Sequence, residues 1–336
     1  MSKKVNNYFF SIVIPTYNPR EYIPRLLKSI TQNACLDKIE VIISDDCSTD
    51  TFDDVLEQFS NINFLKICNK KHSSFPRDGR QNGMDNAHGK WIAFADQDDY
   101  FIENSFDKLM SFIENNNAQN IIVSNFIEQS SETGNEIIRT KDSGWTHGKL
   151  YEKEFLEKYD IKYDEINYCE DINLTNKIDC VLTINQIVPF EFKEYFYVWL
   201  RRKDSLSDIE YFRQSMPDYI NATLGVIIES IDKNVDNTNV IGILNVKFII
   251  ALLHVYFYYQ SRQLYGDKQG LIRSLAVLQP IYSRFKLITG FGNEDIIGFV
   301  HNDLIMVYEQ TRTGDFNQIP FIEQVSFVDW MRLYLD

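Results

Sequence analysis

Residues 89–99 read GKWIAFADQDD, an apolar run that ends in three carboxylates and one amide. The segment Trp91–Ala95 is short and apolar, which is typical of a buried strand in a parallel sheet. Carboxylates gathered at the end of such a strand repel one another and lose hydration, so a bound cation is a natural way to hold them. Their hard oxygen atoms suit Mg²⁺ or Mn²⁺. The alternative interpretation is a solvated turn that caps the helix expected near Glu103.

The first half of the chain alternates strand and helix patterns. Five strands are predicted, at Phe9–Pro15, Ile39–Ser44, Asn63–Cys68, Trp91–Ala95 and Ile121–Phe126. Helical spacing predicts helices at Tyr22–Ile30, Asp53–Phe59, Asn104–Ile113 and Lys149–Tyr159. This alternation indicates an α/β fold with a mainly parallel sheet flanked by helices. Ligands bind beyond the carboxyl ends of such strands, where this chain carries Thr16-Tyr17-Asn18, Asp45-Asp46 and the acidic run 96–99.

Charge distinguishes one stretch from the rest of the chain. The 336 residues carry 34 Lys and Arg against 48 Asp and Glu, and the net charge of −14 argues against general nucleic-acid binding. Residues 69–90 hold five cations against two carboxylates, a local charge of +3. Cations ahead of an acidic turn suit a metal–diphosphate ligand, because each part neutralises the other. Taken alone, the stretch is better explained as an exposed loop and helix face.

Two further acidic pairs have both a functional and a structural interpretation. Asp45-Asp46 follows a strand and can accept hydrogen bonds from a ribose or a base N–H, or it can form an ordinary loop. Glu170-Asp171 precedes a helical pattern, where acidic side chains stabilise the helix dipole. Its functional interpretation is a general base held at a helix start.

The chain lacks the sequence motifs of several enzyme classes. No G-x-G-x-x-G follows the first strand, and neither a G-x-x-x-x-G-K-[ST] loop nor a G-x-S-x-G elbow occurs. The five histidines form no H-x-x-x-H pair. These absences argue against Rossmann-type dinucleotide binding, phosphate-loop chemistry, serine hydrolysis and a catalytic zinc.

The cysteines and the apolar segments bear on location. Five dispersed cysteines without a C-x-x-C pair fit neither a disulfide framework nor a zinc cage, and they indicate reduced thiols. The N-terminus lacks the long apolar stretch of a signal peptide. The most apolar later stretch, Val240–Tyr259, contains three polar interruptions, so we interpret it as a buried or interfacial helix. We expect a cytoplasmic protein, with peripheral attachment at the inner face of the membrane as the open question.

The order of these segments resembles family 2 glycosyltransferases, which have the GT-A fold. The family's [ILV]-P-x-Y-N turn is matched by residues 14–18, its D-D-x-S-x-D segment by 45–50 and its A-R-N-x-G helix by 79–83. Its G-x-[YW]-[IV]-x-F-x-D-x-D-D strand is matched by residues 89–99, and its single G-K-L-[YF]…E-D-x-x-[LF] pattern by residues 148–151 together with 170–174. Tyr197, Arg201-Arg202 and Ser205-Leu206-Ser207 also fit the family. The resemblance covers about residues 8–207, and it is specific because five weak motifs occur in order.

This resemblance implies an inverting transfer of a sugar from a nucleotide-diphosphate donor, most often a UDP-sugar, to a hydroxyl acceptor. It implies that Pro15, Thr16 and Tyr17 line the base pocket and that Asp45 hydrogen-bonds the base. Arg80 would approach the diphosphate and Asp96 would face the ribose. Asp98 would ligate Mn²⁺ or Mg²⁺, with Asp99 supporting the turn. Asp171 would be the catalytic base, with Glu170 beside it in the nucleotide-sugar site.

The sequence departs from the family pattern at two places and leaves other functions open. Gln81 stands where the family has Asn, and residues 72–76 resemble an insertion beside the sugar pocket. A metal-dependent sugar nucleotidyltransferase is one alternative, although it would place a glycine-rich loop after its first strand. A non-catalytic binding protein with the same fold is another, although it would have lost the acidic turn or Asp171. The acceptor is expected to be a glycan, a lipid-linked or a protein substrate of bacterial surface polysaccharide, teichoic acid or glycoprotein synthesis.

We expect a catalytic domain over residues 1–205, with a nucleotide-sugar-binding half at about 8–128 and an acceptor-side half at about 129–205. Strand-like stretches run from Val181 to Arg202, and residues 206–336 show chiefly helical periods. The aromatic block Leu252–Tyr265 is predicted to be packed helix core. An acceptor-binding wall and an oligomer contact are the alternatives for this block.

Overall fold

The computed structural model describes residues 8–73, 75–140, 144–202, 209–261, 268–300 and 327–335. The chain forms two units, each with its own core. Unit 1 comprises residues 1–165 and 188–205, and unit 2 comprises residues 166–187 and 206–336. The second and longer segment of unit 2 begins after residue 205, which is the domain boundary expected from the sequence. An earlier segment, residues 166–187, also belongs to unit 2.

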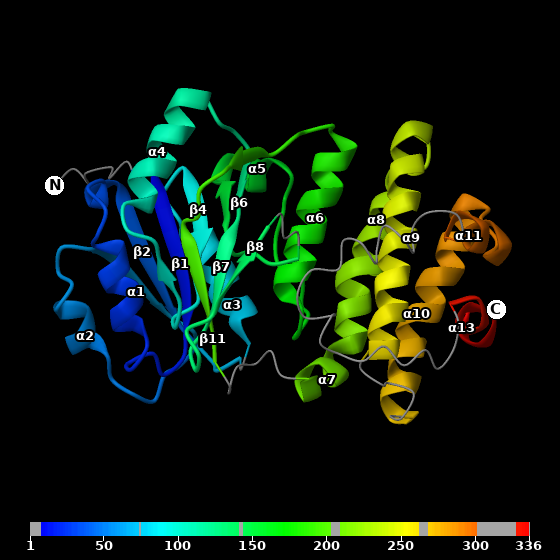
Figure 1. Ribbon diagram of the computed structural model, residues 1–336, viewed down its shortest axis with the longest axis horizontal. Coiled ribbons are helices and arrows are strands. Elements are labelled where there is room, and N and C mark those ends of the chain that lie inside the picture. The colour runs from blue at the N-terminus through cyan, green and yellow to red at the C-terminus, as the bar shows by residue number, and fades with distance from the viewer. Residues whose placement is uncertain are drawn as a thin grey trace. The chain divides into compact units, whose positions relative to one another are not determined.

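A seven-stranded mixed sheet forms the centre of unit 1, in the strand order β10-β6-β9-β4-β1-β2-β3 (Figure 1). The strands are β1 (Phe10–Thr16), β2 (Ile39–Asp45), β3 (Asn63–Cys68), β4 (Trp91–Phe94), β6 (Ile121–Ser124), β9 (Lys149–Glu152) and β10 (Phe190–Phe192). β3, β2, β1 and β4 are mutually parallel, and β10 is parallel to β6. β9 runs antiparallel to both β4 and β6. The predicted sheet is therefore confirmed, with β9 as its antiparallel member.

The central strands are buried on both faces, which explains their continuous runs of β-branched residues. Every residue of β2 is buried, and in β1 only Pro15 is partly exposed. β1 pairs with β2 so that Thr16 lies opposite Asp45, and it pairs with β4 so that Val13 lies opposite Phe94. The carboxyl ends of these three strands consequently meet at one edge of the sheet.

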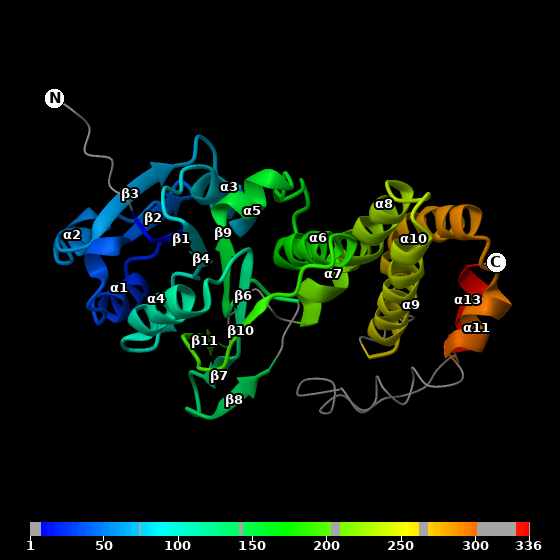
Figure 2. The same cartoon turned by 90° about the horizontal axis from the view of Figure 1, so that it is seen from above.

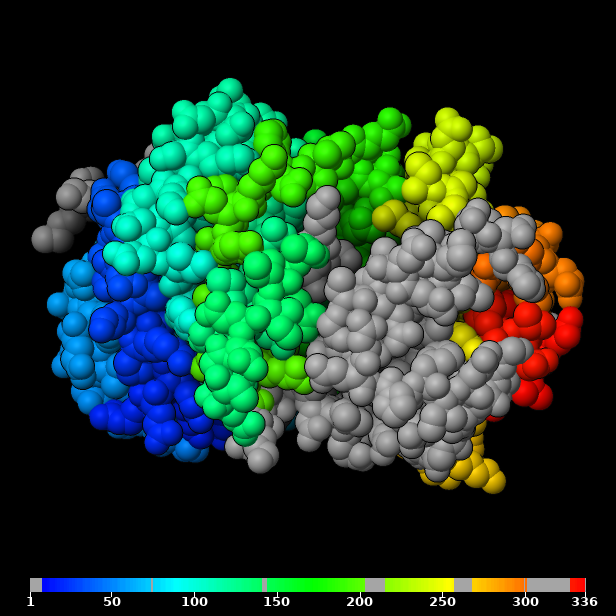
Figure 3. Space-filling view, in the orientation of Figure 1, coloured from blue at the N-terminus to red at the C-terminus, as the bar shows by residue number. Residues whose placement is uncertain are grey.

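Helices cover both faces of this sheet. They are α1 (Ile23–Ile30), α2 (Asp53–Glu57), α3 (Pro76–Asp85), α4 (Ser105–Asn116) and α5 (Lys153–Lys158). Figure 2 shows α1 and α4 on one side of the sheet and α3 and α5 on the other, and α1 and α2 lie side by side on the face shown in Figure 3. α1 has a proline in its first turn, where no backbone N–H is needed. It buries Ile23, Leu26, Leu27 and Ile30, which recur at helical spacing.

The predicted helix Lys149–Tyr159 is wrong in its first four residues. Residues Lys149–Glu152 form β9, and the helix begins only at Lys153. β9 is buried and pairs with a strand on each side, so its backbone groups are satisfied by neighbours that are distant in sequence. The strand-like stretch predicted from Val181 is likewise helical up to Ile184, and strands follow only at β10 and later.

A second, four-stranded sheet in unit 1 has the order β5-β11-β7-β8. Its strands are β5 (Tyr100–Phe101), β7 (Phe126–Ser130), β8 (Glu136–Arg139) and β11 (Tyr197–Arg201). β5 directly follows the acidic run 96–99, and β11 pairs with it through Tyr197 and Val198. This pairing brings residues near position 200 next to the acidic run.

Unit 2 is helical throughout the residues that the structure describes. Its elements are α6 (Glu170–Ile184), α7 (Ile209–Ile220), a π-helical turn (Asn221–Gly225), α8 (Val226–Asp232), α9 (Thr238–Ser261), α10 (Lys268–Thr289), α11 (Asn293–Phe299) and α13 (Phe327–Tyr334). Its core includes Phe248, which stacks on Phe285 with ring centroids 4.0 Å apart. Tyr256 is buried against Phe327 and Trp330, as packed helix core predicts. The side chains of residues 257–259 and Tyr265, and the motif at 205–207, lie outside the described residues.

One described helix is long and apolar enough to cross a membrane. It is the stretch Thr238–Tyr256 of α9, of which half is buried inside the structure. A single helix of this kind is weak evidence for a membrane span, because a core helix of a soluble protein passes the same test.

We expect Gly83→Ala to destabilise the protein. A Cβ atom at Gly83 would lie 2.2 Å from Cγ1 of Val13, so α3 would have to move away from β1. Overpacking of this kind costs about 1–3 kcal/mol, which urea unfolding can measure. Gly298→Ala is the matched control, because a Cβ there meets nothing within 4 Å and should stabilise α11 slightly. A Gly83→Ala protein as stable as the wild type would contradict the close packing of α3 on β1.

Candidate functional site

The acidic turn, residues Asp96–Asp99, joins β4 to β5 at the carboxyl edge of the main sheet. Asp99 is fully buried and accepts a hydrogen bond from the backbone N–H of Leu200 at 2.8 Å. The hydroxyl of Tyr197 donates a second one to Asp99 and accepts the backbone N–H of Asp96 at 3.0 Å. β11 therefore fixes both ends of the turn.

Negative charge is concentrated in this turn. Burial raises the pKa of the Asp99 carboxyl well above its usual range, and the charges of Asp96 and Asp98 act in the same direction. Burial and the charge of Asp96 also raise the pKa of Asp98, against the opposing effect of Arg202. Both shifts mean that the ionised turn is costly without a cation beside it.

Two basic side chains face Asp96. Nη2 of Arg80 donates to Oδ1 of Asp96 at 2.7 Å, and Nε2 of His147 lies 3.8 Å from Oδ2. Partial burial acts to raise the pKa of Asp96, but the charges of Arg80 and His147 outweigh it and lower that pKa. Arg80 itself is buried, whereas the Asp96 side chain is 31% exposed. The pair thus presents an accessible carboxylate with a cation directly behind it.

Arg80 reaches this position because α3 packs closely on β1. A Cβ at Gly79 would lie 2.8 Å from Cβ of Pro15, so only glycine lets the helix approach the strand this far. Gln81, where the family has Asn, accepts the backbone N–H of Tyr163 at 2.9 Å. The Gln81 side chain therefore connects α3 to the segment at Tyr163. The position of Arg80 depends instead on the close approach of Gly79 to Pro15.

Asp98 forms an ion pair with an arginine from the end of β11. Its Oδ2 accepts from Nε and Nη2 of Arg202 at 2.7 and 2.6 Å, and Arg202 lies over the ring of Tyr22. Its other oxygen, Oδ1, has no hydrogen-bond partner among the described residues. One oxygen of Asp98 is therefore available to a ligand.

The turn contains donor atoms that fit a divalent metal ion. One ligand atom each from Asp96, Asp99 and His147 lie within 4.8 Å of one another. Both oxygens of Asp99 already accept hydrogen bonds from β11, and that side chain is fully buried. The more exposed oxygens of Asp96 and Asp98 are better suited to a hard cation that also binds a ligand. The donor set of the turn therefore fits Mn²⁺ or Mg²⁺.

Asp45 lies at the end of β2 with one oxygen engaged and one available. Oδ1 accepts from the backbone N–H of Ser48 at 3.0 Å and from its hydroxyl at 2.6 Å. Oδ2 has no hydrogen-bond partner among the described residues. The carboxylate is largely buried, so its orientation is fixed while one acceptor remains. The second oxygen can therefore accept a hydrogen bond from a ligand.

The end of β1 carries the three other residues assigned to the base pocket. Pro15 packs against α3, and Thr16 is buried with its carbonyl accepting the backbone N–H of Asp46 at 2.8 Å. Tyr17 is 41% exposed and stacks on His72, with ring centroids 4.3 Å apart. The segment that resembles an insertion is thus attached to the end of β1.

Asp46 holds that segment in place. Nδ1 of His72 lies 2.8 Å from Oδ2 of Asp46, and the backbone N–H of Ser73 donates to the same carboxylate at 3.0 Å. Asn69 donates a further hydrogen bond at 2.8 Å. Asp45 and Asp46 therefore have different tasks, the first open to a ligand and the second engaged by the protein.

Gln97 connects the acidic turn to the turn that follows β1. Its side-chain Oε1 accepts the backbone N–H of Tyr17 at 2.9 Å, and its Nε2 donates to the carbonyl of Tyr17 at 3.0 Å. The turns that follow β1 and β4 are joined directly by these two hydrogen bonds.

Glu170 and Asp171 belong to unit 2, whereas the other predicted site residues belong to unit 1. They are the first two residues of α6, and Cys169 before them has a left-handed backbone with φ 60°. Glu170 is buried and Asp171 is partly exposed. Oδ1 of Asp171 accepts the backbone N–H of Ile172 at 2.8 Å, which is compatible with a helix-start role as well as with a catalytic one.

Sequence reasoning missed several residues of the site. The sequence names His72 only as part of a longer segment, gives Asp46 a ligand or loop role together with Asp45, and gives Gln97 and Tyr197 no separate role. His147 lies next to the G-K-L-Y motif, which is the one signal that could have drawn attention to it. Arg202 was included in the family pattern without a partner, and the structure gives it Asp98.

The chain matches the family model "Glycosyl transferase family 2" over residues 11–178, half of its length. Two relatives are similar to it in sequence. The poly(ribitol-phosphate) beta-N-acetylglucosaminyltransferase TarS of Staphylococcus aureus is 28% identical over 216 residues, which cover 59% of this chain and 37% of TarS. The minor teichoic acid biosynthesis protein GgaA of Bacillus subtilis is 25% identical over 233 residues, covering 63% of this chain and 52% of GgaA. The matched region thus spans about a third to a half of these relatives.

Solved structures of S. aureus TarS residues 1–349 have the same fold. One has a TM-score of 0.61 at 18% sequence identity and covers 95% of this chain and 98% of that one. A complex of the same TarS fragment with UDP-GlcNAc has a TM-score of 0.51 at 18% identity, covering 95% and 98%.

This protein belongs to glycosyl transferase family 2, and its unit 1 has the GT-A fold. The predicted family and fold class are therefore confirmed, and the helical character of the C-terminal region is confirmed as well.

Proposed function

We propose that the protein is an inverting glycosyltransferase that moves a sugar from a UDP-sugar to a hydroxyl group of a teichoic-acid-type polymer. The family membership supports the reaction class, and the names of TarS and GgaA support the acceptor class. The single observation that carries the donor proposal is Asp45, a fixed carboxylate with one available oxygen at the end of β2, where it pairs with Thr16 of β1. Uracil offers an N–H to such an acceptor, whereas the corresponding atom of cytosine is itself an acceptor.

The acidic turn and α3 are proposed to bind the rest of the donor. Asp96 faces the ribose, and Arg80 supplies positive charge toward the diphosphate. In this structure, the charge of Arg80 is neutralised by its ion pair with Asp96. Asp98, with Asp96, would hold Mn²⁺ or Mg²⁺. The bound cation would neutralise the diphosphate and stabilise the charge that develops as it leaves.

Asp171 is proposed to act as the general base, with Glu170 beside it. It takes the proton from the acceptor hydroxyl as that oxygen attacks the anomeric carbon of the donor sugar. A new bond forms between the acceptor oxygen and the anomeric carbon, and the bond from that carbon to the diphosphate oxygen breaks. UDP leaves with the electron pair, and the configuration at the anomeric carbon is inverted.

Product analysis separates this function from its alternatives. With UDP-GlcNAc and a poly(ribitol phosphate) acceptor, a glycosyltransferase releases UDP, a nucleotidyltransferase makes or consumes pyrophosphate, and a non-catalytic binding protein releases nothing. We place the reaction in the cytoplasm, where UDP-sugars are made and where the free state of all five cysteines is ordinary.

We expect Asp45→Asn to change nucleotide preference. The asparagine keeps an acceptor for Ser48 but presents an amide N–H₂ where the free oxygen stood. Loss of a hydrogen bond to a charged group should weaken UDP binding about 10- to 100-fold, while CDP binding improves. Calorimetric titration of both nucleotides measures this, with Asp53→Asn, an exposed acid of α2, as the matched control. Equal loss of UDP and CDP affinity would argue against base recognition by Asp45.

We expect Asp98→Asn to weaken metal-dependent UDP binding and His147→Ala to preserve it. The first change removes a charged oxygen that is available to a cation, and the second removes a side chain that faces Asp96 from the other direction. Titration with Mn²⁺, followed by electron paramagnetic resonance with and without UDP, measures both effects. The reverse result would assign the ion to the group Asp96, Asp99 and His147 instead.

We expect Asp171→Asn to reduce kcat about 100- to 10,000-fold and to leave the dissociation constant of UDP-GlcNAc unchanged. A general base acts on the acceptor proton and contributes little to binding of the donor. Asp179→Asn, in the same helix and paired with Lys247, is the control and should retain activity. Unchanged turnover in Asp171→Asn would remove this residue from the mechanism.

A further inference from the structure

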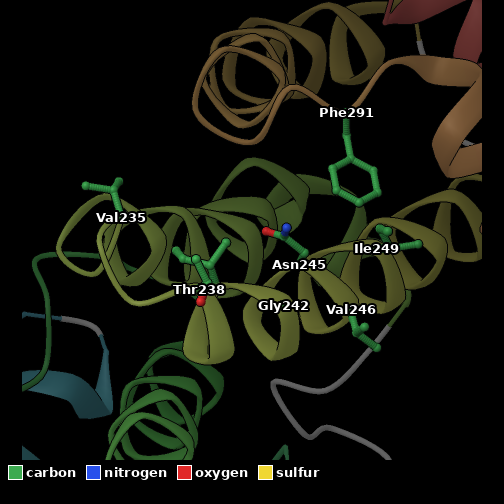
Figure 4. A pocket seen from close by; sticks show the side chains of 8 residues that line it. Val235, Thr238, Gly242, Asn245, Val246, Ile249 and Phe291 are labelled. Atoms are coloured by element: carbon green, nitrogen blue, oxygen red, sulfur yellow. The ribbon is translucent and has the colours of Figure 1, made fainter.

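Unit 2 contains a cavity of about 360 Å³ on the side of α9 that faces the segment before α11 (Figure 4). Ile241, Val246, Ile249 and Phe291 give it apolar walls, and Thr238 and Asn245 are its polar side chains. All of these residues lie within unit 2, and none of them takes part in the proposed glycosyl transfer.

Asn245 is the unusual member of this lining. It stands in the middle of the most apolar helix of the chain and is only 8% exposed. Its Oδ1 is buried and has no hydrogen-bond partner among the described residues. Figure 4 shows Asn245 and Ile249 on the side of α9 turned toward Phe291. A buried amide oxygen without a partner is costly, so its retention here needs a compensating interaction.

Water is a poor occupant of this cavity. A buried water molecule needs two to four polar partners, and most of this lining is apolar. The second cavity, about 450 Å³ in unit 1, differs in this respect. Three of its polar side chains are already paired: Tyr100 donates to Gln129, Arg25 donates to the carbonyl of Asp98, and the hydroxyl of Ser29 donates to the carbonyl of Leu26. Of these two cavities, the one in unit 2 combines apolar walls with an amide oxygen that has no hydrogen-bond partner among the described residues.

We propose that the cavity of unit 2 binds a small amphiphile, an apolar ring or chain that ends in a hydroxyl or N–H donor. The amide of Asn245, whose Oδ1 is buried in this structure, turns toward the cavity so that Oδ1 pairs with the donor, and the apolar part packs on Ile249 and Phe291. The cavity volume lies at the lower end of the range that small-molecule sites occupy, so the ligand is compact. This site is separate from the donor-sugar site and stands whether or not the proposed transfer activity is correct.

Indole and benzofuran form a matched pair of probes for this site. They share size and shape, but only indole has an N–H donor. Binding to the full-length protein can be followed by saturation-transfer NMR and by calorimetric titration. We expect indole to bind about three- to tenfold more tightly than benzofuran, because one hydrogen bond is gained. Equal affinity of the two probes, or no saturable binding of indole at millimolar concentration, would overturn the proposal.

Two variants test the residues themselves. Asn245→Leu removes the unpaired amide, so it should raise Tm and abolish the preference for indole over benzofuran. Gly242→Leu places a side chain where the cavity wall is open, since a Cβ there meets nothing within 4 Å, and should block both probes without a loss of folding. Gly298→Leu makes the same change at an exposed position of α11 outside the lining and should leave binding intact. Indole binding that survives Gly242→Leu, or that Gly298→Leu also removes, would refute this site.

Discussion

The hydrogen bonds of the buried Asp99 carboxylate are the interaction on which the candidate site depends. The acidic turn brings like charges together at a sheet edge, and such a turn would open if its ends were not fixed. Tyr197 and the backbone of Leu200 hold Asp99, and the same tyrosine hydroxyl receives the backbone N–H of Asp96. A short strand pairing, β5 with β11, thereby fixes the position of carboxylates that come almost a hundred residues earlier in the chain.

Once the turn is fixed, each of its acids has a different environment. Asp99 is internal and structural, Asp96 faces two basic side chains, and Asp98 shares one oxygen with Arg202. The same division holds at the end of β2, where Asp46 secures the segment that begins at His72 while Asp45 keeps an oxygen for a ligand. Adjacent residues of one type therefore separate into structural and binding roles through their partners.

Much of the main sheet and of the candidate site could be predicted from the sequence. The features that could not be predicted depend on contacts between residues that are distant in the chain. The main strands and the meeting of Thr16, Asp45 and the acidic turn follow from β-branched runs that end in polar residues. β9 was missed because Lys149–Glu152 shows no strand pattern of its own and becomes a strand through two distant neighbours. His147 and Tyr197 reach the turn by tertiary packing, which leaves no local signal. The start of a helix at Glu170 could be predicted from the acidic pair and the helical pattern that follows it. The membership of this helix in unit 2 could not, because it depends on packing against α8 and α9.

The amide of Gln97 has a consequence for how the donor site responds to a ligand. It donates one hydrogen bond to the backbone of Tyr17 and accepts one from it, as a residue of a neighbouring strand would. These two hydrogen bonds extend the connection between the two segments beyond the last paired residues of β1 and β4. A displacement of the turn after β1 therefore stretches these two hydrogen bonds to the acidic turn. Two separate loops are thereby tied to each other by one side chain rather than by strand pairing.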